Sequence, residues 1–131
     1  MPNQITDAAL KRLRDDVIDY LVAHDLFDDV IIYEGGRRYL SDGYGRTSDA
    51  EHIDHTTRKG TEVELWVESA QASQYLEFAN DETLSMAFEG PLYDAMNYGD
   101  GTVESGLQRI FERYGLYFEM GDAWNLTAYP C

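Results

Sequence analysis

The residues best suited to chemistry lie in one polar stretch, residues 48–60, with the sequence SDAEHIDHTTRKG. It holds two of the chain's three histidines, His52 and His55, beside the carboxylates of Glu51 and Asp54. Imidazole and carboxylate groups together suit zinc, nickel or ferrous iron, and side chains three or four residues apart share a helix face. The stretch therefore suggests a divalent-metal site in which Glu51 or Asp54 acts as the base for a metal-bound water.

A structural role explains the same residues without a metal. Ser48 and Glu51 have the spacing of a helix capping box, in which each side chain bonds the other residue's backbone N–H. Asp49 would then lie at the positive end of a helical turn, with Arg58 and Lys59 near its negative end. An isolated His-x-x-His pair is a weak metal signature, because it lacks the rest of the zincin motif. We therefore interpret the stretch first as an exposed, capped helical turn and predict no cofactor; a divalent metal is the alternative.

Charge is unevenly distributed around this stretch. Residues 37–59 carry five bases and four acids, whereas residues 60–108 carry ten acids and no base. The cations could bind an anionic ligand, or dock onto the acidic segment of the same or a neighbouring subunit. A tryptophan among the glutamates of an alternating strand pattern is typical of an interface. The candidate anion-binding or interface residues are Arg37, Arg38, Arg46, Arg58, Lys59 and Trp66.

The chain also contains ten tyrosines. Most are expected at the edge of the core, with the ring buried and the hydroxyl in water. A sharper hypothesis is a tyrosine-rich cleft for a small ligand. Its candidate residues are Tyr33, Tyr39, Tyr75 and Tyr117.

The hydrophobic pattern predicts the elements that must position these side chains. Apolar residues at helical spacing predict helices at 7–23, 91–96 and 102–114. Alternation and β-branched composition predict strands at 29–34, 37–40, 62–68, 75–79, 84–88, 116–120 and 123–129. Gly35 and Gly36 predict a two-residue hairpin turn, because glycine readily adopts positive φ at both turn positions. Residues 41–60 show no period, which indicates a long irregular or short-helical loop.

This order of elements predicts a single α+β domain over residues 1–131. Strands and helices do not alternate as they would around a parallel sheet, and no repeat or linker supports a second domain. We expect a curved, mainly antiparallel sheet of about five to seven strands. An N-terminal helix and a later helix pair should pack on one of its faces.

The formal net charge is −15, from 25 acids and 10 bases, and lysine occurs only at Lys11 and Lys59. This composition resembles that of proteins from salt-in halophiles, where molar salt shortens the Debye length to about 3 Å and screens carboxylate repulsion. Clustered bases for phosphate contacts are lacking, which argues against nucleic-acid binding. No apolar run approaches the roughly 18 residues of a membrane span, and no signal peptide is evident. We therefore expect a cytoplasmic protein without membrane contact.

Together these observations favour a small, acidic, halophile-type protein that binds rather than catalyses. The expected partner is a second copy of the chain, as a homodimer, or another protein. One alternative is a small metal-dependent enzyme that uses the cluster of Glu51, His52, Asp54 and His55. The other is a small-ligand carrier or sensor with a tyrosine-rich cleft.

Overall fold

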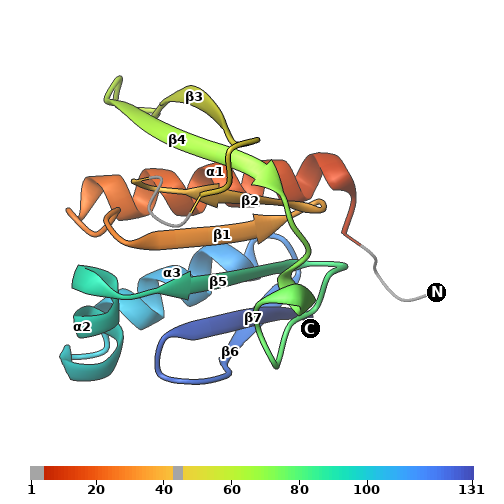
Figure 1. The fold of residues 1–131 in the computed structure, drawn as a ribbon. Coiled ribbons are helices and arrows are strands. Elements are labelled where there is room, and N and C mark those ends of the chain that lie inside the picture. Colours follow the sequence, from red (N-terminus) through yellow and green to blue (C-terminus); the bar gives the residue numbers. More distant parts are fainter. Residues whose placement is uncertain (1–4, 43–45) are drawn as a thin grey trace.

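The computed structural model describes residues 5–42 and 46–131. These residues form an open, seven-stranded antiparallel sheet and three α-helices, which confirms the predicted α+β class (Figure 1). None of these helices is long and apolar enough to span a membrane. The helices are α1 (Asp7–Ala23), α2 (Gly90–Tyr98) and α3 (Thr102–Glu112), with a short 3-10 helix, η1 (Ala72–Gln74). The strands are β1 (Val30–Glu34), β2 (Arg37–Leu40), β3 (Glu51–Thr56), β4 (Glu62–Ser69), β5 (Leu84–Phe88), β6 (Leu116–Met120) and β7 (Asn125–Pro130).

Across the sheet the strand order is β3-β4-β2-β1-β5-β7-β6, so β1 and β5 lie near the centre and β3 and β6 form the two edges. Helices α1 and α3 lie along one face, behind the sheet in Figure 1. On α1, Leu13, Val17 and Leu21 recur at helical spacing and are fully buried. They belong to one core cluster with Ile32 of β1 and Phe111 of α3. Burying a side chain of this size contributes about 1.5–3 kcal/mol, so this helix-covered face holds the central strands in place.

The β1–β2 hairpin turns at Gly35 and Gly36, as predicted, with φ angles of +64° and +78°. Two successive positive φ angles suit the right-handed twist of the flanking strands and disfavour residues with a Cβ. The tight turn sets the register, in which Tyr33 lies opposite Arg38. Tyr33 belongs to a cluster separate from the helix-covered core, so this pair faces away from the helices.

Residues 41–60 differ from the prediction. Residues 51–56 form strand β3, which pairs antiparallel with β4 from Glu51 opposite Val67 to Thr56 opposite Glu62. The helical turn and the Ser48–Glu51 capping box are therefore wrong, because Glu51 begins a strand. The reason lies in the tertiary structure. The polar sequence of residues 51–56 has no strong preference for helix or strand, and the free edge of β4 offers hydrogen-bond partners to its backbone N–H and C=O groups.

The strand predicted at residues 75–79 is also wrong. This part of the chain lies in the connection between β4 and β5, which contains only η1. Both edges of β5 are already paired, with β1 and with β7. The connection is instead held by local bonds, such as that from the Ser73 N–H to Asp81 Oδ1 over 3.0 Å.

Candidate functional site

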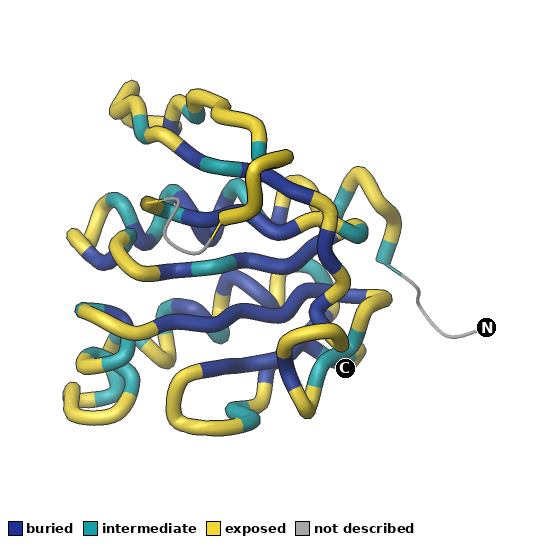
Figure 2. The backbone as a smooth tube through the Cα atoms, viewed as in Figure 1, coloured by how far each residue is buried: buried dark blue, intermediate teal, exposed yellow. Residues whose placement is uncertain are grey.

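The face of the sheet away from the helices is only partly covered. The β4–β5 connection buries a second, small cluster there, which includes Tyr33, Leu76 and Ala87. Strand β5 is consequently buried along its whole length (Figure 2). The part of this face that stays open forms a pocket beside the cluster.

This pocket has a volume of about 310 Å³, at the lower end of the range of about 300–1,000 Å³ typical of small-molecule sites. Its walls include Tyr33, Tyr75, Leu76, Ala87 and Trp124. The rings of Tyr33 and Tyr75 stack with their centroids 5.9 Å apart. The pocket therefore offers flat apolar surface to a ligand.

One wall of the pocket is fixed by a buried ion pair. Arg38 Nε donates to Glu68 Oε1 over 2.6 Å, and the two side chains are 8% and 3% exposed. Burial opposes the charge of Glu68, but hydrogen bonds from the Thr47 hydroxyl and backbone N–H and from Arg38 hold its pKa below the usual value. The guanidinium also lies 4.5 Å from the ring centroid of Tyr75. The positive charge of this wall is thus matched by Glu68 and held in place.

Three carboxylates, those of Asp29, Asp42 and Glu89, also line the pocket. Asp29 precedes Tyr33 by four residues, a rise of about 13 Å along a strand. Strand pairing brings two of the acids together, since the Glu89 N–H donates to the Asp29 carbonyl over 3.1 Å. Burial, and then the charges of Asp42, Asp28 and Glu89, raise the pKa of Asp29. Carboxylates crowded in this way favour a cation among them.

The structure brings together two of the four tyrosines predicted to line a cleft. Tyr33 and Tyr75 line the pocket. Tyr39 lies opposite Ile32 in the β1–β2 register and therefore shares the helix-covered face. Tyr117 lies on β6, at the far edge of the sheet. Of the four tyrosines predicted to line a cleft, only Tyr33 and Tyr75 therefore line this pocket.

Sequence reasoning missed the other wall residues. Asp29, Asp42, Glu89 and Trp124 all lie just outside strands, in four different connections. Residues of this kind share no spacing along the chain, and only the order of strands brings them to one pocket. Nothing in their local sequence could have assembled them.

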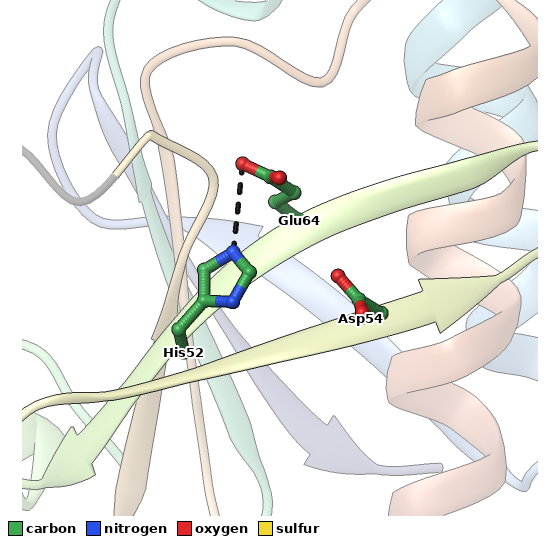
Figure 3. Close-up of side chains that lie close together, drawn as sticks. All are labelled: His52, Asp54 and Glu64. Atoms are coloured by element: carbon green, nitrogen blue, oxygen red, sulfur yellow. Dashed lines mark ion pairs between the residues drawn. The ribbon is translucent and has the colours of Figure 1, made fainter.

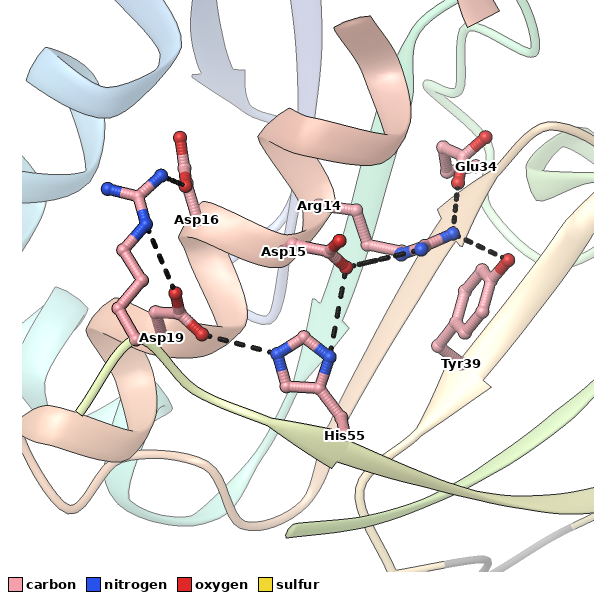
Figure 4. Close-up of polar contacts among 8 residues, drawn as sticks. Arg14, Asp15, Asp16, Asp19, Glu34, Tyr39 and His55 are labelled. Carbon is pink, nitrogen blue, oxygen red and sulfur yellow. Dashed lines mark hydrogen bonds and ion pairs between the residues drawn. The ribbon is translucent and has the colours of Figure 1, made fainter. Parts of the chain in front are cut away.

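The two histidines of the opening stretch lie on opposite faces of β3. Successive strand residues alternate faces, so an odd spacing separates His52 from His55. His52 lies beside Glu64 of β4 (Figure 3), whereas His55 points toward α1 (Figure 4). The predicted set of Glu51, His52, Asp54 and His55 is therefore not assembled into one site.

A different trio converges on the outer face of the β3–β4 hairpin. The ligand atoms of His52, Asp54 and Glu64 all lie within 4.8 Å of one another (Figure 3). His52 Nε2 is 3.5 Å from Glu64 Oε2, and the imidazole packs edge-on against Trp66, with centroids 5.0 Å apart. Asp54 and Glu64 are direct cross-strand partners. One imidazole and two carboxylates suit zinc or another divalent transition metal.

On its inner face the hairpin meets α1 through charged groups. His55 Nε2 lies 3.2 Å from Asp19 Oδ1, and His55 Nδ1 lies 3.9 Å from Asp15 Oδ1 (Figure 4). Arg58, just past the end of β3, donates to Asp16 and lies 3.7 Å from Asp19. Three acids on one face of α1 thus hold an imidazole and a guanidinium of the hairpin.

The same row of polar groups continues into the core. Asp16 is only 7% exposed and also accepts a hydrogen bond from the Tyr114 hydroxyl. Burial, and then this bond, raise the pKa of Tyr114 to about 12. Farther along α1, Arg14 donates over 2.7 Å to both Glu34 and the Tyr39 hydroxyl (Figure 4). The buried carboxylates of Asp16 and Glu34 at the two ends of this network are therefore hydrogen-bonded.

The five predicted cations do not converge on one anion site. Arg38 is paired with Glu68, which belongs to the acidic segment 60–108, and Arg58 is paired with Asp16 of α1. The Arg46 guanidinium lies 4.0 Å from the ring centroid of Trp66. The remaining candidates, Arg37 and Lys59, are exposed.

Two larger clefts, of about 560 Å³ each, flank α1. One lies beside the Arg58–Asp16 pair and the other beside Gly35 and Gly36. Among the described residues that line them, no pair of aromatic rings stacks as Tyr33 and Tyr75 do. The smaller aromatic pocket is therefore the better-formed site.

The fold and the pocket together define an open α+β domain with a small pocket, lined by aromatic and acidic residues, on the partly covered face of its sheet. The chain matches no protein-family model, and no curated protein or solved structure is significantly similar to it. Its function is therefore inferred from the chemistry of its own residues.

Proposed function

We propose that this protein is a non-catalytic binding domain whose pocket takes a small organic cation with an aromatic or apolar body. The observation that supports this most directly is the arrangement of the pocket of about 310 Å³. Its lining combines the stacked rings of Tyr33 and Tyr75 with the carboxylates of Asp29, Asp42 and Glu89.

The charge of the pocket favours a cation over an anion. Its guanidinium, Arg38, is already paired with Glu68, whereas burial, and then the negative charges of Asp42, Asp28 and Glu89, raise the pKa of Asp29. Aromatic faces also attract ammonium groups, with a contribution of about 0.5–2 kcal/mol. A ligand with an ammonium group and a ring would therefore match both the carboxylates and the aromatic surface of the pocket.

The lining favours binding over catalysis. Among its described residues there is no serine, cysteine, histidine or lysine, so the usual pairing of a nucleophile with an adjacent base is missing. The pocket contributes shape, aromatic surface and charge, which are the properties of a carrier or sensor site.

Matched small molecules test this proposal. We expect phenethylamine to bind at least about ten-fold more tightly than 2-phenylethanol, its neutral counterpart, a difference of about 1.4 kcal/mol. Titration followed by backbone NMR should shift the amides of Tyr33 and Ala87. Equal affinity for the two compounds, or shifts confined to other parts of the chain, would contradict the proposal.

The variants Asp29→Asn and Glu89→Gln should lose most of the preference for the cation, because each removes one negative charge with little change in shape. Asn tolerates the left-handed backbone of Asp29, whose φ is +58°. Glu62→Gln is the matched control, since Glu62 is an exposed acid of β4 outside the pocket. It should leave the affinity unchanged.

A second candidate function is divalent-metal binding by His52, Asp54 and Glu64. It is favoured by the convergence of three ligand atoms within 4.8 Å and by the like charges of Asp54 and Glu64 in direct cross-strand register, which a cation would stabilise. A metal held here would keep positions open for water, as in the alternative of a metal-dependent enzyme.

Zinc titration by calorimetry tests this second function. His52→Ala should abolish binding of one equivalent, because the imidazole is the only nitrogen ligand of the trio. His24→Ala is the control, since His24 is an exposed histidine that stacks on Tyr20 of α1 instead. Negligible zinc affinity of the unmodified protein would eliminate this function.

The composition supports one further part of the proposal, that the domain works at high salt. A net charge of −15 on 131 residues produces strong self-repulsion, which molar salt screens.

A further inference from the structure

The two edges of the sheet are protected to different degrees. At the β6 edge, Gln108 of α3 accepts from the Phe118 N–H over 2.8 Å and donates to the Phe118 carbonyl over 3.2 Å. The middle of that strand is therefore capped by a side chain. At the β3 edge, no side chain among the described residues bonds the backbone of Glu51–Thr56. An uncapped edge strand presents a row of N–H and C=O groups to another strand.

Strand β3 is also exposed on its side chains. Every residue of Glu51–Thr56 is exposed except His55 (Figure 2). Ile53, at its centre, is one of the exposed large hydrophobic residues, at 37%. The strand carries neither proline nor lysine, which commonly block edge-to-edge pairing.

We propose that β3 is a dimerisation edge, along which a second copy of the chain pairs antiparallel with its own β3, centred on Ile53. In this register the two Ile53 side chains meet at the twofold axis. Glu51 of each copy lies opposite His55 of the other, and His52 lies opposite Asp54. Both ring nitrogens of His55 already face Asp15 and Asp19 of α1, so the Glu51–His55 pairs add little. The His52 imidazole can donate an N–H to Asp54 of the second copy whether or not the ring is charged. The strand is therefore complementary to itself through two His52–Asp54 pairs.

The neighbouring registers are worse. Pairing can move only in steps of two residues if the hydrogen-bond ladder is kept. One such step places His52 opposite His52, and the step in the other direction places Asp54 opposite Asp54. Two aspartates directly opposite each other are destabilising, and pairing His52 with His52 gives up both His52–Asp54 pairs. The sequence of β3 therefore favours the register centred on Ile53.

The β6 edge is less available for pairing. Self-pairing about Phe118 would place Leu116 opposite Met120 and Tyr117 opposite Glu119, a pair that can also hydrogen-bond. It would also have to displace Gln108 from the Phe118 backbone. A second copy therefore fits the β3 edge better than the β6 edge.

Dimerisation of this kind has a consequence for the pocket. The twofold axis of a continuous antiparallel sheet is perpendicular to the sheet, so both copies would present their uncovered faces on the same side. The inference does not rest on ligand binding by that pocket. It also leaves the His52 imidazole shared between its own Glu64 and the Asp54 of the second copy.

A charge swap tests the register. The chain should dimerise in molar potassium chloride, where repulsion between two copies of charge −15 is screened, as measured by sedimentation equilibrium. His52→Asp alone places carboxylates opposite each other twice and should weaken association at least about ten-fold. Adding Asp54→His reverses both pairs and should restore association. Glu119→Lys on β6 is the control and should have no effect.

Cross-linking provides a second test that does not depend on the swap variants. In a Cys131→Ser background, Ile53→Cys should form a disulfide-linked dimer under mild oxidation, because directly opposed strand residues come within disulfide range. Glu119→Cys should not. Circular dichroism confirms that each variant is folded. A monomer at every salt concentration, or association that ignores the β3 substitutions, would overturn the proposal.

Discussion

Strands β1 and β5 are buried almost throughout, whereas the β3 strand is exposed except at His55 (Figure 2). The central strands are covered by apolar side chains of α1 and α3 on one face and by the β4–β5 connection on the other. Strand β3 and the turn that follows it meet α1 through His55 and Arg58 instead, although β4 contributes Leu65 and Val67 to the core cluster. Apolar burial is strong per residue, while an ion pair that reaches solvent, such as that of Arg58, is weak and screened by salt. The two regions should therefore respond differently to the same kind of change.

The largest difference should come from two arginines. Arg38→Ala leaves Glu68 charged and buried without its partner, so the free energy of unfolding should fall by about 3–5 kcal/mol. Arg58→Ala removes a side chain that is 72% exposed, and Asp16 keeps its bond from Tyr114, so the loss should be about 1 kcal/mol or less. Urea denaturation measures both, and equal losses would contradict the contrast.

Two isoleucines give the next difference. Ile32→Ala and Ile53→Ala delete the same atoms, the first from the core side of β1 and the second from the exposed edge strand β3. The core deletion should cost about 2–5 kcal/mol, because it removes buried surface and leaves a cavity. The edge deletion should stay within about 0.5 kcal/mol in the monomer. Thermal and urea unfolding at low protein concentration measures both losses in the free energy of unfolding. A loss for Ile53→Ala as large as that for Ile32→Ala would contradict this contrast.

Salt should stabilise the fold of the whole chain but weaken the ion pairs that hold the β3–β4 hairpin to α1. We expect near-UV circular dichroism of the whole chain to be lost below about 0.5 M salt, where carboxylate repulsion is poorly screened. Above that concentration the ion pairs of the hairpin weaken, so β3 amides should exchange with solvent faster than β1 amides by at least about 100-fold. Circular dichroism measures the first effect, and hydrogen exchange followed by NMR measures the second. Full tertiary structure in dilute buffer would refute the high-salt part of the proposed function.

The smallest expected effect is a change in pH dependence at Tyr114. Its pKa is raised from 10.0 to about 12 in the folded state, so folding favours the protonated phenol. The stability it contributes is complete below pH 10 and is lost as the pH rises from 10 to about 12. Tyr114→Phe should flatten the decline in stability over this interval, as measured by urea unfolding at each pH. Tyr117→Phe, on the exposed face of β6, serves as the control and should leave the decline unchanged.

The sequence predicted correctly those helices, strands and turns whose formation depends on residues close together in the chain. Apolar residues at helical spacing identified α1, and the N-terminus of this helix is capped locally by the Thr6 hydroxyl, which accepts from the Ala9 N–H over 3.1 Å. Alternation identified β4, and two glycines identified the β1–β2 turn. Each of these features depends on residues within one or two turns of the chain, so the sequence contains its explanation.

The prediction failed for residues 51–56 for an equally physical reason. An edge strand that is exposed on both faces does not require alternating apolar residues. The polar residues of this segment are equally compatible with a capped helical turn. The structure was decided by β4, whose free edge pairs with it. Once β3 is a strand, His52 and His55 must point to opposite faces.

The candidate site was predicted even less completely than the fold. Tyr33 and Tyr75 were identified as cleft residues, but the acids and Trp124 that complete the pocket were not. These residues come from four connections that meet only because β1 lies between β2 and β5. Strand order is a long-range property, and no local spacing encodes it.

By itself, the sequence determined the helices, the hairpin turn and the acidic surface, since these depend on neighbours along the chain and on composition. Only the tertiary structure decided that the stretch SDAEHIDHTTRKG contains a strand, that its histidines separate, and that a pocket opens on the uncovered face of the sheet. The reason is that backbone hydrogen bonds between strands and the burial of one face join residues far apart in sequence. Those contacts fix which side chains meet.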